Sequence, residues 1–267
     1  MKHAILVIAG LLALPGMVLA FEQKDVDTLM ATRQCEECDL RDADLKAADL
    51  KGARLAGANL RDADLKDADL SGADLRGADL RRADLEKSAL QGARLDGANL
   101  VGADMEKARL DGAQLGGTDL RGADMEKASL KGAVLVDADL RGTDLKRADL
   151  SDADLSGANL ERASLERAIL RGARLDGARL GWADLDRSDL RLAKLTGADM
   201  RNVKLKRADL SGANLGKANL TDAVLRITKL KGTNLSGVRG LTQAQLDRAC
   251  GNDATVLPEG LTIKPCG

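Results

Sequence analysis

Four cysteines are the side chains in this sequence with the clearest capacity for chemistry. Cys35 and Cys38 form a Cys-X-X-Cys motif, a spacing typical of a redox site or of half a zinc site. The other two, Cys250 and Cys266, lie near the C-terminus. Zinc would need further ligands, commonly histidine, and the one histidine is His3. Thiol or metal chemistry therefore depends on where the fold places the four sulfur atoms.

A second set of candidates is a column of seven basic residues spaced twenty apart, which we call the basic ridge. It could bind a polyanion such as a glycan, a lipid headgroup or nucleic acid. We favour the alternative of a charge-paired face, because an acidic residue directly precedes five of the seven. Trp182, one of two aromatic residues in the sequence, is a further candidate contact. The ridge comprises Lys87, Lys107, Lys127, Arg147, Arg167, Arg187 and Arg207.

Composition disfavours several classes of function. The 41 basic and 42 acidic residues nearly cancel, so the total charge gives no reason to expect a nucleic-acid partner. The chain has no tyrosine, and its one histidine lies in a segment that we expect to be removed. We therefore expect that the protein is not an enzyme and that it has neither a cofactor nor a metal site.

The first twenty residues have the features of a signal peptide. Lys2 gives a positive start, residues 4–14 are apolar, and Val18 and Ala20 suit signal peptidase. We expect cleavage after Ala20 and a periplasmic or secreted protein. The apolar run is too short to span a bilayer comfortably, and no later segment resembles a transmembrane helix.

A strict five-residue period runs through the middle of the chain. From Leu40 to Leu235 every fifth residue is Leu or, at three positions, Met, and the residue two before it is usually Ala. This period fits neither an α-helix nor a plain strand, so the chain must turn a corner every five residues. Leu and Ala would point inward and the residue between them outward. The sequence therefore predicts a solenoid.

Units such as Ala-Asp-Leu at 43–45 and Ala-Asn-Leu at 58–60 are each followed by two variable residues. They resemble the pentapeptide-repeat family, whose pattern is A(D/N)LXX, over about residues 38 to 237. With the export signal, the chain resembles an exported bacterial member of that family. The resemblance implies an all-β fold, a right-handed quadrilateral parallel β-helix with four repeats per coil. Forty repeats would make about ten coils and a rod about 48 Å long.

The residue two after each central Leu predicts how the corner turns. On the sides centred on Leu50 and Leu55 it is Gly in eight of ten coils, but on the side centred on Leu45 it is never Gly. Glycine there suits a type II turn, whose third residue needs a positive φ. We expect type II corners after the first two sides. After the Leu45 side, where Lys87 or Arg147 occupies the position, we expect another turn type.

Both ends of a β-helix expose unpaired backbone and must be covered. Val26, Leu29 and Met30 have helical spacing, which predicts a lid on the first coil. A capping-box pattern at Thr242 and Gln245 predicts a short helix to about residue 249, followed by an extended tail. Four segments result: a signal peptide at 1–20, an N-terminal helical cap with the cysteine motif at 21–37, the β-helix at 38–237, and a C-terminal helix and tail cap at 238–267.

The repeat register turns both Cys35 and Cys38 inward across the first corner. A β-turn holds its first and fourth Cα atoms within about 7 Å, which overlaps the roughly 4.4–6.8 Å that a disulfide requires. A structural disulfide is favoured in an oxidising compartment, with a redox site and a metal site as the alternatives. Since Cys250 and Cys266 lie at the other end of a rod about 48 Å long, the expected pairs are Cys35–Cys38 and Cys250–Cys266.

These features favour a non-catalytic exported scaffold or binding protein. Its charged rod surface would meet a protein or a polyanionic envelope component, and a homodimer through an end cap would be compatible with the fold. The alternative comes from the resemblance, because some pentapeptide-repeat proteins act on DNA gyrase as strongly acidic DNA mimics. Removal of Lys2 leaves 40 basic and 42 acidic residues, and a net charge of −2 in an exported protein opposes that alternative.

Overall fold

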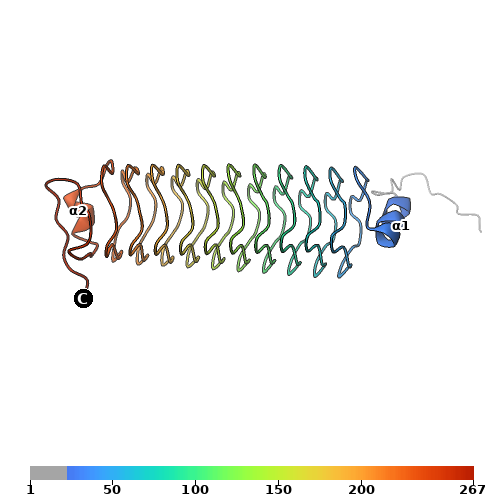
Figure 1. Ribbon diagram of the computed structural model, residues 1–267, viewed down its shortest axis with the longest axis horizontal. Coiled ribbons are helices and arrows are strands. Elements are labelled where there is room, and N and C mark those ends of the chain that lie inside the picture. The colour runs from blue at the N-terminus through green and yellow to red at the C-terminus, as the bar shows by residue number, and fades with distance from the viewer. Residues whose placement is uncertain (1–22) are drawn as a thin grey trace, which may run out of the picture.

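The computed structural model describes residues 23–267, and the predicted signal peptide at 1–20 lies outside these residues. The chain forms a long rod, with helix α1 (Gln23–Thr32) at one end and helix α2 (Gln243–Leu246) at the other (Figure 1). The described part between the helices contains no continuous strand. Single extended residues alternate with corners, and each pairs with an equivalent residue on the next coil.

Parallel bridges join each coil to the next at a constant offset. Asp39 pairs with Asn59, and Asn59 pairs with Asp79. The amide of Leu40 donates to the carbonyl of Asn59 at 2.8 Å, and the amide of Asn59 donates to the carbonyl of Cys38 at 2.9 Å. This offset of twenty residues holds from Gln34 to Arg239, so each coil consists of four five-residue repeats, as predicted.

The interior of the rod is filled by the two inward columns. The Leu and Met column is at most 3% exposed and the Ala column, from Ala43 onward, at most 9%, which confirms their predicted orientation. Cys38, at the first position of the Ala column, is partly buried. Threonine replaces Ala at a few positions without leaving its hydroxyl unpaired. The Thr118 hydroxyl, for example, donates to the carbonyl of Leu95 at 2.9 Å, as a buried hydroxyl should.

The Asp or Asn before each Leu has a structural role. The coil-to-coil ladder leaves the amide of the residue after Leu without a backbone acceptor. A side-chain oxygen accepts from that amide instead: the Lys66 amide donates to Asp64 Oδ1 at 3.0 Å. Where the residue before Leu is neither Asp nor Asn, a corner carboxylate of the previous coil can replace it, as Asp186 does for the Lys206 amide at 2.8 Å. The family-like pattern thus reflects backbone satisfaction.

The predicted difference between corners is wrong. Every fifth residue from Asp42 to Gly237 has a positive φ, whether or not it is glycine. Lys87 and Arg147, both at φ 59°, adopt the same left-handed conformation as Gly52 at φ 65°. The ladder holds the non-glycine corners in place: the Lys87 amide donates to the Glu106 carbonyl at 2.9 Å. Such corners persist because the surrounding structure determines them, at a cost of about 1–2 kcal/mol each.

The two helices differ in detail from those predicted. On α1, Leu29 is fully buried but Met30 is 53% exposed, so Met30 does not join the buried face. The capping box at Thr242 and Gln245 is present, but α2 ends at Leu246, about a turn short of the predicted end. The chain after α2 is not a plain extended tail: it turns at residues 247–248, 253–254 and 259–260 and continues the parallel ladder through Cys250 and Val256.

Candidate functional site

The four cysteines form two disulfides. Cys35 bonds to Cys38 with a Cα–Cα distance of 5.3 Å, and Cys250 bonds to Cys266 with a Cα–Cα distance of 4.8 Å. Cys35 is 2% exposed and packs below α1, where its sulfur lies 3.4 Å from the Asp25 carbonyl oxygen. A sulfur in this position is not the exposed thiolate that a redox centre uses. Residues 23–267 hold no cluster of three potential metal-ligating side chains.

The structure places the basic ridge along one edge of the rod, at the corner after the Leu45 side. Much of it is neutralised by carboxylates at the preceding position. The ammonium groups of Lys87, Lys107 and Lys127 lie 2.6–2.7 Å from the adjoining glutamates. Arg167 and Arg187 share Glu166 at 3.6 and 3.9 Å. This geometry supports a charge-paired face over most of the ridge.

Glu86 shows how strongly the paired part of the ridge holds its charges. Its side chain is 16% exposed and lies between Lys66 of the previous coil and Lys87. Hydrogen bonds from Lys66, which has the larger effect, and from Lys87 stabilise the carboxylate and lower the pKa of Glu86 from 4.5 to about 2. Both cations are therefore compensated within the rod.

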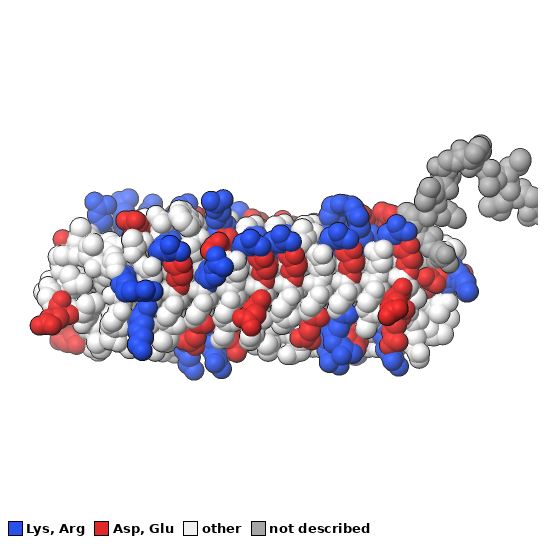
Figure 2. Space-filling view, turned by 90° about the horizontal axis from the view of Figure 1, so that it is seen from above, with Lys and Arg blue, Asp and Glu red and all other residues white. Residues whose placement is uncertain are grey.

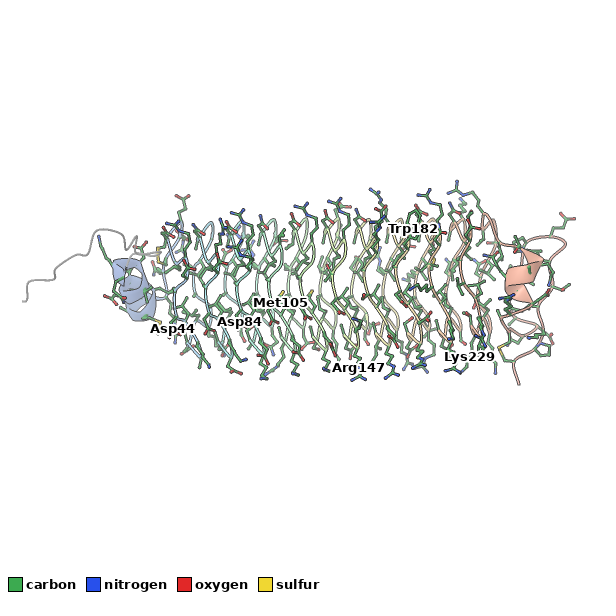
Figure 3. All side chains as sticks on the ribbon, turned by 180° about the vertical axis from the view of Figure 1, so that it is seen from behind. Asp44, Asp84, Met105, Arg147, Trp182 and Lys229 are labelled. Carbon is green, nitrogen blue, oxygen red and sulfur yellow. A yellow bond between two sulfur atoms is a disulfide. The ribbon has the colours of Figure 1, made fainter. Side chains whose placement is uncertain are left out.

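Two ridge residues and the tryptophan differ from this pattern. Arg147 and Arg207 form no ion pair within residues 23–267. Trp182 is 52% exposed, but it lies on the other edge of the Leu45 side, opposite the edge that carries Arg147 (Figure 3). The structure thus does not bring Trp182 and the ridge together into one site.

Charge is segregated along the rod, and the total charge of the sequence conceals this. Residues 23–190 hold 27 basic and 35 acidic residues, whereas residues 191–239 hold eleven basic and three acidic. The net charges are −8 and +8. On the face in Figure 2, basic and acidic groups lie side by side along much of the rod. A count in a sliding window of the sequence would have found the difference.

The excess cations gather most densely on the last two coils of the Leu45 side. Arg226 stacks one coil beyond Lys206, and the Ile227 amide donates to the Arg248 carbonyl at 2.6 Å. Val224 and Ile227 are 47% and 50% exposed among these cations. We call this surface the C-terminal basic patch. It comprises Lys204, Lys206, Arg207, Val224, Arg226, Ile227 and Arg248.

A small hollow adjoins the patch where the last coil meets α2. It is lined by Ala223, Val224, Leu225 and Ala244, with Gln245 and Arg248 at its edge. The patch and the hollow together therefore combine cations with exposed aliphatic side chains.

No helix within residues 23–267 has the length and apolarity needed to cross a bilayer.

Known proteins give the repeat region a clear assignment. A family model described as pentapeptide repeats matches in eight copies, over residues 38–77, 78–115, 108–147, 148–185, 173–212 and 204–239. No curated protein matches the sequence significantly.

Solved structures of similar proteins are also found. HetL, a pentapeptide repeat protein involved in heterocyst differentiation regulation from the cyanobacterium Nostoc sp. strain PCC 7120, is 33% identical. The match covers 86% of this chain and 97% of HetL, with a TM-score of 0.37. A pentapeptide repeat protein of the Arabidopsis thaliana thylakoid lumen is 31% identical, over 43% of this chain and 82% of its own, with a TM-score of 0.40. QnrB1, a plasmid-mediated fluoroquinolone resistance protein, is 18% identical over 75% of this chain and 90% of its own, with a TM-score of 0.49.

Proposed function

The chain belongs to the pentapeptide-repeat family, whose fold is a right-handed β-helix solenoid, and we propose that it is a non-catalytic, exported binding protein that meets its partner through the outer sides of the rod. The observation that carries this proposal is the filled interior. Because Leu, Met and Ala, with a few Ser, Thr and Val, fill it, a partner can be met only by the outward side chains, and these differ from coil to coil while the core repeats.

Export is part of the proposal. The two disulfides fit an oxidising compartment, and the sequence of residues 1–20 fits a signal peptide cleaved after Ala20. N-terminal sequencing of protein from the native host should begin at Phe21. Recovery of only the full-length chain from the cytosol would contradict export.

We also propose that both ends of a rod of about ten coils are capped. At the N-terminal end, the Asp39 amide donates to a carboxylate oxygen of Asp25 on α1 at 3.0 Å. At the C-terminal end, the Gln245 side chain donates to the carbonyls of Leu220 and Ala223 at 3.0 and 2.9 Å. The Asp39 amide and the Ala223 carbonyl are groups that a further coil would otherwise pair, so capped rods would not join end to end through their backbones.

Site-specific cross-linking in the native host tests the binding role. A photoreactive residue replaces one outward residue on each side of a central coil: Asp119, Asp124, Ser129 or Val134. A surface-binding protein should give adducts in the exported fraction from some sides and not from others. Equal labelling from all four sides, or adducts in the cytosol alone, would contradict the proposal.

One observation bears on the second candidate, a DNA mimic acting on gyrase or another nucleic-acid-binding protein. The Leu45 side carries five stacked aspartates that form no ion pair within residues 23–267: Asp44, Asp64, Asp84, Asp104 and Asp124. Their spacing of about 4.8 Å gives roughly a third of the charge density of duplex DNA, which has one charge per about 1.7 Å. We therefore expect the mature protein neither to inhibit gyrase supercoiling nor to protect gyrase from quinolones at micromolar concentration. Either effect would place the DNA mimic first.

A further inference from the structure

In the C-terminal basic patch several cations without carboxylate partners lie together, whereas elsewhere on the Leu45 side of the described residues such cations occur singly, as Lys46 and Arg147 do. Lys206, Arg207, Arg226 and Arg248 form no ion pair within residues 23–267, and only Lys204 is paired, with Asp184 at 3.0 Å. Like charges stacked about 4.8 Å apart repel each other. Elsewhere on the same side acidic neighbours relieve this repulsion, so the patch is open to an external anion.

Exposed aliphatic side chains lie within the same surface. Val224 and Ile227 are about half exposed, and the hollow beside α2 continues the apolar surface towards Ala244. Ile227 occupies a corner with φ 61°, a conformation that β-branched residues rarely adopt. A charged or small residue would suit solvent better at both positions.

We propose that the C-terminal basic patch binds the surface of an anionic lipid bilayer. The guanidinium and ammonium groups would contact the headgroup phosphates, and Val224 and Ile227 would enter the interface between headgroups and acyl chains. This inference rests on the proposed exported binding role and names its partner.

Two other occupants fit the surface less well. Single-stranded nucleic acid binds by stacking its bases on aromatic side chains as well as by charge, and the one aromatic residue of the described part, Trp182, lies off the patch. A second copy of the chain could oppose its aspartates to these cations. One side of the rod, however, measures only about 48 by 10 Å, roughly 500 Å², against about 800 Å² per partner for a stable interface.

Vesicle sedimentation with the mature protein, residues 21–267, tests the inference. The vesicles contain phosphatidylcholine alone or with about one third phosphatidylglycerol. Binding should require the anionic lipid and should weaken with salt, because the headgroup potential is screened. The double variant K206Q/R226Q should weaken binding about 30-fold, since each cation near an anionic surface contributes about a factor of five.

The matched control is K66Q/K146Q, which removes two cations from the same column. Both are paired within the rod, Lys66 with Glu86 and Lys146 with Asp144, so binding should change by less than about twofold. Ile227→Asn tests the apolar contact: Asn tolerates the left-handed corner, and binding in high salt should fall further than in wild type. Circular dichroism verifies that each variant is folded.

Three results would overturn the inference: equal weakening by the two double variants, equal binding to both kinds of vesicle, or tighter binding to a single-stranded oligonucleotide at the same phosphate concentration. Adducts from the exported fraction without any vesicle binding would remove the lipid partner and leave the proposed function in place. Vesicle binding by a protein that is found only in the cytosol would instead keep the lipid partner and contradict the proposed exported function.

Discussion

Residues 23–190 and residues 191–239 share one backbone and one core but carry opposite surfaces. In both regions parallel bridges join residues twenty apart, and Leu or Met fills the interior. The first region has a net charge of −8 and the second of +8. The inward positions specify the solenoid in both, so the outward positions are free to differ. The place where they differ most is therefore where binding is to be sought.

Energetics explains why the fold tolerates this difference. Exposed ion pairs contribute only about 0–1 kcal/mol each, whereas a fully buried Leu contributes about 1.5–3 kcal/mol. Even the best-paired residues of the first region, such as Lys87 beside Glu86, lie outside the core. Losing such pairs in residues 191–239 costs little stability, and the unpaired cations remain available to a ligand.

The largest expected effect tests whether the two regions have the same core. Leu140→Lys in the first region and Leu210→Lys in the second each bury a charge without a partner, at positions that are 0% exposed. Each should lower the free energy of unfolding by about 3–5 kcal/mol, while Leu→Met at the same positions costs less than about 1.5 kcal/mol. Urea denaturation measures both. A much smaller loss at Leu210 would show that the second region has a weaker core.

Removal of a disulfide should have the next largest effect on stability, and the loss should differ between the two ends of the rod. Cys35 and Cys38 are three residues apart, whereas Cys250 and Cys266 are sixteen apart. Because a longer loop restricts the unfolded chain more, loss of the second disulfide should cost about 3 kcal/mol and loss of the first about 2 kcal/mol. Thermal melting of C35S/C38S and C250S/C266S tests this order. The reverse order would indicate that packing below α1, rather than loop closure, decides the effect.

Replacing a cation by glutamate should change the free energy of unfolding in opposite directions in the two regions. Lys66→Glu places a glutamate beside Glu86 and removes an ion pair, so it should destabilise the rod by about 0.5–1 kcal/mol. Arg226→Glu, in the same column, gives Lys206 an opposite charge one coil away and should stabilise by about 0.5 kcal/mol. Both shifts in the urea midpoint should vanish in about 1 M salt. Effects of the same sign would mean that the cations of the second region are already compensated.

Most of the fold follows from the sequence because its determinants are local and repeat. The inward Leu and Ala columns, four repeats per coil, the capping box and both disulfides were predicted correctly. The corners were not, because glycine permits a positive φ but is not required for one. At Lys87 and Arg147 the ladder imposes the left-handed conformation, and this constraint comes from the neighbouring coils.

The candidate surfaces were less predictable. The basic ridge appears in the sequence as a column, but whether its charges are free depends on distances such as those between Glu86 and its two lysines. The C-terminal basic patch was missed because opposite charges of the two regions cancel in the total. The role of Gln245 as a donor to two carbonyls of the last coil depends on where α2 docks, which no local pattern encodes.

The smallest expected effect concerns the pH dependence of the charge-paired region. Lys66, and then Lys87, lower the pKa of Glu86 from 4.5 to about 2. A carboxyl with a lowered pKa in the folded state stabilises that state fully above its unfolded pKa and loses this contribution as the pH falls towards the folded value. Between pH 4.5 and about 2, the free energy of unfolding should therefore fall less steeply in Glu86→Gln than in wild type.

Lys66→Met should also make the free energy of unfolding fall less steeply over this pH range, because it removes the main cause of the lowered pKa. Lys46→Met, one coil earlier in the same column, removes a cation that pairs with no carboxylate within residues 23–267 and should follow the wild-type curve. If Glu86→Gln and wild type lose stability in parallel, the acid sensitivity of the rod arises at other carboxylates, and the tight pairing of the first region does not distinguish it from the second.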